Sequence, residues 1–251
     1  MKVTVCEMPD DRVAFATAWD ALVAHTRASQ SDLVLLPELP FTSWFAGIPA
    51  FDANIWRDAE TAHHEMLARL SDLASATVLG TYPVTSGAHH INRAFVWTPT
   101  TGAQAAHDKY YLPNEAGFYE RNWFDRSERD FSLTRTGEAA IGFLICTELM
   151  FNEWARAYGK QGANIIAVPR ATTLDYEHWV IAPRMAAYVS GAFVLSSNRV
   201  APGSFCGCGV VVGPDGSVLA ATSRQQPFVT VEIALAESAL AKTTYPRDVF
   251  E

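Results

Sequence analysis

The segment Ile141-Gly-Phe-Leu-Ile-Cys-Thr-Glu-Leu-Met-Phe-Asn-Glu-Trp-Ala-Arg156 carries the pattern that decides the fold. It overlaps a continuous apolar run, Ala140–Ile145, which is typical of a strand buried on both faces. Cys146 ends this run, a helix is predicted over Asn152–Lys160, and a second apolar run, Ala163–Val168, predicts another buried strand. Strand, helix and strand in this order indicate an α/β layered fold with parallel strands.

The same alternation extends along the chain in both directions. Strands are predicted at Lys2–Cys6, Asp32–Pro37, Thr77–Val84, Asn92–Trp97, Ala103–Asp108, Ala192–Ser196 and Phe228–Ile233. Helices are predicted from Asp10 or Asp11 to about Ala28, over Ala53–Ser75, and near Tyr176–Val189, where Pro183 breaks or starts the helix. A hairpin is expected at Gly213–Gly216. Two mixed sheets sandwiched between helices would accommodate about a dozen strands.

Composition limits what the protein can bind. The chain has 251 residues, of which 49% are hydrophobic and 12% aromatic, so it can bury a substantial core. Its 27 acidic and 19 basic residues give a net charge of −8, which removes the attraction that general nucleic-acid or anionic-membrane binding needs. Asp10 and Asp11 interrupt any secretory signal, and no run reaches the ~20 apolar residues of a membrane span. We expect a cytoplasmic protein with small-molecule partners, no nucleic acid and no membrane, forming one domain over residues 1–251.

The cysteines and histidines do not predict a metal centre. In a chain of this length without a signal peptide, Cys6, Cys146, Cys206 and Cys208 are interpreted as thiols. Cys206 and Cys208 have strand spacing and are interpreted as core or sheet-face thiols. The pairs His63-His64 and His89-His90 lack zinc-type spacing, because adjacent side chains point to different sides. We therefore expect no metal and no organic cofactor.

Three chemically different side chains stand where predicted strands end. Glu38 ends the run beginning at Leu33, Lys109 follows the strand Ala103–Asp108, and Cys146 sits at a strand-to-helix turn. The carboxyl edge of a sheet is where ligands bind in such folds, and a helix N-terminus near Cys146 favours its thiolate. Cys146 alone could equally be a small buried hydrophobe. Together, a carboxylate, an ammonium and a thiol supply a base, an electrostatic stabiliser and a nucleophile for acyl transfer.

These residues also carry a resemblance to a known family. Leu-Leu-Pro-Glu38, Lys109-Tyr-Tyr-Leu-Pro113 and Leu-Ile-Cys146-Thr-Glu148 resemble, in order and spacing, the Glu, Lys and Cys motifs of the nitrilase superfamily, the carbon–nitrogen hydrolases. The later segments Asn164–Ala171 and Ser197-Asn-Arg199 are similar as well. The resemblance implies a four-layer αββα sandwich that pairs into a homodimer. It also implies that Glu38 is the general base, Cys146 the nucleophile that forms a thioester, and Lys109 with the Thr147 backbone N–H the oxyanion stabiliser.

The resemblance suggests further site residues. In the long aromatic segment Lys109–Gly137, Glu120 of Gly-Phe-Tyr-Glu is favoured over Glu115 as a second glutamate that orients the lysine. Thr147 and Tyr111 stand where many members carry other residues, so both are expected to shape the substrate pocket. Arg170 and Glu148 could bind a substrate's charged end or could form a structural pair. Trp44, Phe45 and Trp179 could line the pocket or belong to the core.

The expected activity is hydrolysis of a small amide or N-carbamoyl compound, because the Gly-Phe-Tyr-Glu segment resembles the amidase and carbamoylase branches. The same three groups could instead hydrolyse a nitrile or pass the acyl group to an amine. A non-catalytic binding or regulatory homologue is the alternative from another class, although retention of Glu38, Lys109 and Cys146 argues against it.

Overall fold

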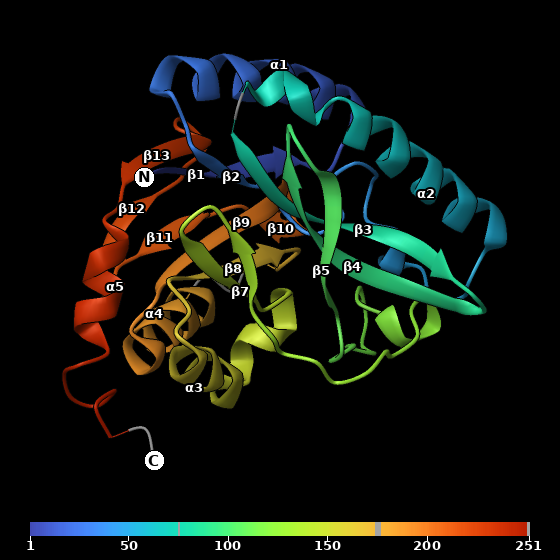
Figure 1. Ribbon diagram of the computed structural model, residues 1–251. Helices are drawn as coiled ribbons and strands as arrows, with labels where there is room; N and C mark the ends of the chain where they lie inside the picture. Colours follow the sequence, from blue (N-terminus) through green and yellow to red (C-terminus); the bar gives the residue numbers. More distant parts are fainter. Residues whose placement is uncertain (75, 174–176, 250–251) are drawn as a thin grey trace.

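The computed structural model describes residues 1–74, 76–173 and 177–249 (Figure 1). Its strands are β1 Lys2–Pro9, β2 Leu33–Leu35, β3 Thr77–Ser86, β4 His89–Thr98, β5 Gly102–Asp108, β6 Thr134–Thr136, β7 Ala139–Phe143, β8 Ile165–Arg170, β9 Phe193–Ala201, β10 Phe205–Cys206, β11 Val210–Val212, β12 Val218–Ala221 and β13 Phe228–Glu232. The α-helices are α1 Arg12–Ser29, α2 Ala53–Ala68, α3 Asn152–Gln161, α4 His178–Ser190 and α5 Leu235–Ala241.

Strand β1 joins two sheets into one continuous hydrogen-bonded system. Its first half, Val3–Val5, pairs in parallel with β2, and its second half, Glu7–Pro9, pairs in parallel with β9. The strand order is β5-β4-β3-β2-β1-β9-β8-β7-β6, with β13 antiparallel to β1. One strand therefore belongs to both sheets, and its backbone hydrogen bonds fix the position of one sheet relative to the other.

Helices cover the outer face of each sheet. Figure 1 shows α1 and α2 along one side of the strands and α3 with α4 on the opposite side. Three clusters of buried side chains separate the layers: Trp19 and Phe41 belong to the one under α1 and α2, Val5 and Ile141 to the one between the sheets, and Tyr158 to the one under α3 and α4. Three apolar interfaces between four layers confirm the predicted αββα sandwich.

Most predicted elements are present with shifted ends. Asp11 caps α1 by accepting a 2.8 Å hydrogen bond from the Ala14 N–H, and Gly162 ends α3 in the left-handed conformation. The helix predicted over Ala53–Ser75 stops at Ala68 and is followed by a 3-10 turn, Leu70–Leu73; Ser75 lies outside the described residues.

The expectation that Pro183 breaks or starts its helix is wrong. Pro183 lies inside α4, which begins at His178. Pro183 is the sixth residue of α4, where it removes one backbone N–H donor, and the helix continues beyond it to Ser190. The predicted position Tyr176 lies outside the described residues.

Membrane crossing has no support in this architecture. Within residues 1–74, 76–173 and 177–249, none of the helices combines the length and apolar character that a bilayer span requires.

Close packing around the strand that leads to Cys146 generates the first prediction. A Cβ atom added to Gly142 of β7 would lie 2.6 Å from the ring of Tyr158 on α3. The Tyr158 hydroxyl also donates a 2.8 Å hydrogen bond to the Phe143 carbonyl, so the ring cannot move freely. Gly142→Ala should lower the free energy of unfolding by about 1–3 kcal/mol. Urea denaturation measures this, with Gly47→Ala as the control because its Cβ would meet only ordinary 3.4 Å contacts; equal stability of both variants would contradict the packing argument.

Candidate active site

The ends of three strands bring the predicted catalytic side chains together. Glu38 lies three residues beyond β2, Lys109 directly follows β5, and Cys146 lies three residues beyond β7. The backbone holds these positions firmly, since the Glu38 N–H donates to the Arg170 carbonyl at 3.2 Å and the Lys109 N–H to the Asn92 carbonyl at 2.9 Å. All three side chains are buried. The loops therefore deliver a carboxylate, an ammonium and a thiol into one water-poor volume.

The Lys109 ammonium sits between two carboxylates. Its Nζ donates to Glu38 Oε1 at 2.7 Å and to the two oxygens of Glu120 at 2.8 and 2.6 Å. Asn92 Nδ2 donates a further 2.8 Å hydrogen bond to Glu38 Oε1. Glu115, the competing candidate, is exposed and its backbone pairs with Phe118. The structure thus brings Glu120, and not Glu115, to the lysine.

The charges in this cluster set the protonation states. Burial would lower the pKa of Lys109, but the carboxylates of Glu120 and Glu38 outweigh it and raise that pKa above its usual value. Burial and the neighbouring Glu38 raise the pKa of Glu120, against the opposing effect of Lys109. The lysine is therefore held as a cation whose positive charge is shared by two acids.

Cys146 is held as a neutral thiol in the free protein. Burial raises the pKa of this thiol, Glu38 raises it further, and Lys109 only partly compensates. A helix N-terminus near Cys146 is expected to favour the thiolate, but in the free protein desolvation dominates the pKa of this thiol. The thiol makes a 3.7 Å contact with the Ala171 carbonyl. A base is needed to generate the nucleophile.

Two features of the site are unusual in a folded protein: the backbone conformation of Cys146 and an unpartnered oxygen of Glu38. Cys146 has φ of 51°, the left-handed region that L-residues rarely occupy, which places it at the start of the 3-10 helix Cys146–Met150. Glu38 Oε2 is buried and has no hydrogen-bond partner among the described residues, whereas Oε1 holds both Lys109 and Asn92. One carboxylate oxygen is thus fixed while the other is available to accept a proton.

Glu148 connects the lysine and cysteine segments. One of its oxygens accepts the N–H of Tyr110 at 2.8 Å, and the other accepts the N–H of Ile145 at 2.9 Å and contacts His107 Nε2 at 2.8 Å. Its side chain is fully buried. Glu148 is therefore occupied by the residues next to Lys109 and Cys146, which is the geometry of a positioning group.

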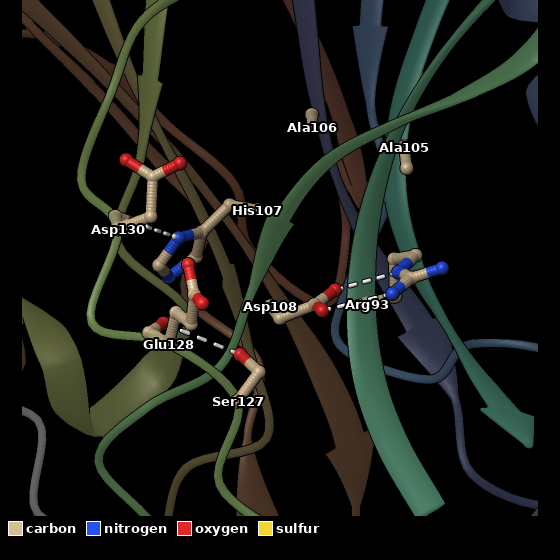
Figure 2. Close-up of a pocket in the computed structure, with 8 residues that line it drawn as sticks. All are labelled: Arg93, Ala105, Ala106, His107, Asp108, Ser127, Glu128 and Asp130. Carbon is tan, nitrogen blue, oxygen red and sulfur yellow. Dashed lines mark hydrogen bonds and ion pairs between the residues drawn. The ribbon is translucent and has the colours of Figure 1, made fainter. Parts of the chain in front are cut away.

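His107 links Glu148 to a polar cavity that is lined by the end of β5 and by Ser127, Glu128 and Asp130. Figure 2 shows this cavity, about 370 Å³, with His107 directed toward Asp130 and Asp108 toward Arg93. The His107 Nδ1 lies 2.9 Å from the Asp130 carbonyl, so both ring nitrogens face acceptors. Burial would lower the pKa of His107, but the Glu148 carboxylate outweighs it and raises the pKa. The cavity is separate from the catalytic cluster, none of whose residues lines it.

Arg170 is also occupied by protein groups. It is buried and donates to Ser196 Oγ at 2.5 Å, to Thr172 Oγ1 at 2.9 Å and to the Cys208 carbonyl at 2.7 Å. Arg170 and Glu148 thus each bind other partners, and no mutual ion pair is found between them in the described part of the chain. The expected structural pair is not formed.

The remaining predicted pocket residues fall into two groups. Tyr111 stacks on Phe151 with ring centroids 4.0 Å apart and accepts a 3.0 Å hydrogen bond from Trp154, so it belongs to the packing beside the site. Phe45 is buried in an aromatic cluster, and Trp179 packs against the core with the Arg170 guanidinium 5.4 Å from its ring. Thr147 and Trp44 are half-buried.

A cavity of about 560 Å³ lies beside these residues. It is lined by the aromatic side chains of Trp44, Phe118 and Phe205 and by Thr173. Phe118 precedes Glu120 by two positions, and Thr173 follows Ala171, the contact of Cys146, by two. The side chains of Glu38, Lys109, Glu120 and Cys146 do not line this cavity, but the segments that hold Glu120 and contact Cys146 continue directly into its wall.

Two residues that fix Glu38 escaped the sequence reasoning. Asn92 of β4 binds the carboxylate of Glu38, which follows β2; β3 lies between these two strands. Arg199, fully enclosed, donates to the backbone carbonyls of Glu38 and Leu39 at 3.0 and 2.6 Å and to Asp10 at 2.8 Å. Asn92 is the first residue of the predicted strand Asn92–Trp97 and stands next to Arg93, so its polarity gave no signal, and its partner is 54 positions away.

This fold and this buried arrangement of thiol, ammonium and carboxylates define a thiol hydrolase of the αββα class. The carbon-nitrogen hydrolase model matches residues 2–243, and the chain belongs to that family, within the nitrilase superfamily. It is accordingly a carbon–nitrogen hydrolase enzyme.

Curated relatives of this chain include two proteins that are named amidases and one that is named a synthetase. A chloroplastic omega-amidase of Arabidopsis thaliana is 26% identical over 242 residues, which cover 89% of this chain and 64% of the relative. An N-carbamoylputrescine amidase of the same plant is 23% identical, covering 88% and 81%. A glutamine-dependent NAD(+) synthetase of Rhodobacter capsulatus is 29% identical, and the match spans 80% of this chain but only 36% of that protein.

Solved structures share the fold. A carbon-nitrogen hydrolase from Helicobacter pylori G27 matches with a TM-score of 0.85 at 22% identity, covering 99% of this chain and 94% of that one. An amidase from Nesterenkonia sp. AN1 matches with a TM-score of 0.79 at 20% identity, covering 96% and 92%; its active-site cysteine carries the acetamide moiety of fluoroacetamide. At these identities, both matches show a shared fold.

The ion cluster predicts a pH-dependent stability defect. Lys109→Met leaves two carboxylates buried without their cation, so the free energy of unfolding should fall by about 3–5 kcal/mol near pH 8. The pKa of Glu120, already raised by burial, rises further without the lysine. Because the pKa of Glu120 is higher in the folded state than in the unfolded state, its contribution to folding stability is fully present below the unfolded pKa. That contribution is lost as the pH rises through the folded pKa. The defect should therefore shrink near pH 5.

Guanidinium denaturation at both pH values measures this defect. Lys160→Met, at an exposed position in the last turn of α3, is the matched control and should change little at either pH. A Lys109→Met defect that is equally large at low pH would show that the lysine is needed for packing rather than for charge.

Proposed function

We propose that this protein hydrolyses a small amide or N-carbamoyl compound through a thioester on Cys146. The observation that carries the proposal is the free Glu38 Oε2 in the same buried cluster as the neutral Cys146 thiol and the Lys109 cation. A neutral thiol with a raised pKa needs a base, and a developing oxyanion needs a fixed cation. The site holds one group for each requirement.

In the first half-reaction, Glu38 Oε2 accepts the thiol proton as Cys146 Sγ attacks the carbonyl carbon. The carbonyl oxygen becomes an oxyanion, stabilised by Lys109 Nζ and by the Thr147 backbone N–H at the start of the 3-10 helix. Glu38 then gives its proton to the leaving nitrogen, the C–N bond breaks, and ammonia or an amine departs. The acyl group remains on Cys146 as a thioester.

In the second half-reaction, Glu38 accepts a proton from water, which attacks the thioester carbonyl. The tetrahedral adduct collapses, the C–S bond breaks, and the proton on Glu38 returns to Cys146. Glu120 keeps Lys109 charged and directed toward the oxyanion throughout, because its two oxygens hold the ammonium from the opposite side to Glu38. Glu148 and Arg170 act by positioning the Cys146 and Glu38 segments rather than by touching the substrate.

The cavity and the relatives support this substrate class. The aromatic lining of Trp44, Phe118 and Phe205 suits a small, uncharged or weakly polar acyl group. The names omega-amidase and N-carbamoylputrescine amidase on relatives support an amide or carbamoyl group over a nitrile. Nitrile hydrolysis and acyl transfer to an amine use the same cluster and are the alternatives.

The cytoplasmic location and the homodimer stay predictions. In favour of a homodimer, α4 exposes Ile181, Met185 and Tyr188 to 60%, 45% and 39%, at helical spacing on one face. A second copy of this chain would bury that stripe.

Trapping the thioester tests the mechanism. Denaturing mass spectrometry of wild type mixed with an amide substrate should show one acyl group added to the peptide 136–156 that contains Cys146. Cys146→Ala should show no adduct and a loss of turnover of at least ~10³-fold. Cys6→Ala is the matched control, since Cys6 is equally buried but bonds to the Leu35 carbonyl away from the cluster. An adduct elsewhere, or activity in Cys146→Ala, overturns the assignment.

Substrate preference is tested by measuring ammonia and amine release from matched amides, carbamoyl amines, carbamoyl amino acids and nitriles. We expect turnover of an amide or carbamoyl compound to exceed that of the corresponding nitrile. Activity on nitriles alone would reverse this ranking while leaving the Cys146 adduct in place.

A further inference from the structure

Two further thiols, Cys206 and Cys208, lie close to the segment Arg170–Thr172, which contacts Cys146. Strand β10 ends at Cys206, and Gly207 and Cys208 both adopt positive φ, 68° and 60°. The chain therefore turns at Gly207, so the sequence interpretation of two thiols on one strand face is wrong. A Cβ at Gly207 would lie 2.5 Å from the Glu7 carboxyl, which leaves glycine as the residue that fits there. Both thiols are free and partly exposed.

The surroundings of Cys206 stabilise a thiolate. Asn198 Nδ2 donates to Cys206 Sγ at 3.3 Å, and Thr172 Oγ1 lies 4.0 Å away. Hydrogen bonding by the Cys208 thiol and the positive charge of the Arg170 guanidinium outweigh the cost of burial and lower the pKa of Cys206 to about 6. The Asn198 amide and the Arg170 charge thus favour the ionised sulfur, which also lies 3.3 Å from the Gly207 carbonyl.

The surroundings of Cys208 do the opposite. Its N–H donates to Glu7 Oε1 at 2.8 Å, and its thiol points back to the Cys206 carbonyl at 3.4 Å. The hydrogen bond to Cys206, burial and the Glu7 charge together raise the pKa of Cys208. The pair is therefore asymmetric: one sulfur is an accessible nucleophile and its neighbour holds the proton.

We propose that Cys206 and Cys208 form a dithiol site that reacts with small disulfides. The Cys206 thiolate attacks one sulfur of the disulfide RS–SR, the S–S bond breaks, and one RS⁻ leaves. Cys208 then loses its proton and attacks the Cys206 sulfur of the mixed disulfide, which releases the second RS⁻. The net change oxidises two cysteine thiols to one disulfide and reduces RS–SR to two thiols RSH.

The site is separate from the nucleophile but coupled to it through one segment. Arg170 donates to the Cys208 carbonyl, and the next residue, Ala171, supplies the carbonyl that Cys146 contacts. Thr172 accepts the Cys206 N–H at 3.2 Å. Cys146 itself is fully buried with a raised pKa, so a small disulfide should find Cys206 first.

Oxidised glutathione is the probe that tests this site at neutral pH. Trypsin separates the cysteines, because Cys6, Cys146 and the pair fall in the peptides 3–12, 136–156 and 200–224. In wild type, the peptide 200–224 should become lighter by two hydrogens before the other two peptides change. Cys208→Ser should instead trap one glutathione on Cys206, and Cys206→Ser should react at least about tenfold more slowly than Cys208→Ser.

The wild-type peptide map needs no variant, so misfolding of a variant cannot hide the answer. Glutathione on Cys146 or Cys6 before the pair, a stable mixed disulfide in wild type, or equal rates for the two serine variants would each overturn the proposal. Reversal of the two-hydrogen change by dithiothreitol supports it; a change that dithiothreitol does not reverse would contradict a disulfide.

Discussion

The ammonium of Lys109, shared between the carboxylates of Glu38 and Glu120, is the interaction on which the site depends. Each of these side chains is buried, and removing an ion from water costs several kcal/mol unless its partners are close and well oriented. Three hydrogen bonds of 2.6 to 2.8 Å meet that condition. Glu38 Oε2, which has no hydrogen-bond partner among the described residues, stays available as a proton acceptor in the same cluster as a thiol that burial holds neutral.

Such a cluster requires rigid supports, and the sandwich supplies them from several elements. Glu38 follows β2, Lys109 follows β5, and Glu120 comes from the aromatic loop, so no single element could hold the three together. Arg199 fixes the Glu38 carbonyl, while Glu148 ties the backbone beside Lys109 to the backbone beside Cys146. The Arg199 and Glu148 side chains that make these contacts are themselves buried and charged. Ion pairs and hydrogen bonds from both sheets thus together offset the free energy of burying the charges of the site.

The fold and the reactive groups could be predicted from sequence because they depend on local patterns. Apolar runs locate buried strands, and a reactive residue at the end of such a run must lie near the sheet edge, as Glu38 and Cys146 do. Arg170 and Glu148 occupy similar places in the sequence, yet they bind protein groups. The sequence does not show which way a side chain points after its strand, nor that Arg170 would meet a carbonyl 38 positions later. The prediction that Cys206 and Cys208 share one strand face was wrong for a related reason, since the chain turns at Gly207 where a strand was expected.

Two features of the free enzyme cost free energy. The left-handed backbone at Cys146 and the unpartnered Oε2 of Glu38 are both maintained by the surrounding bonds. In the mechanism that we propose, attack of Cys146 on a substrate carbonyl passes the thiol proton to Oε2, so the cost of that unpartnered oxygen is recovered in the step itself. An interaction that is completed only in the transition state raises turnover rather than ground-state affinity.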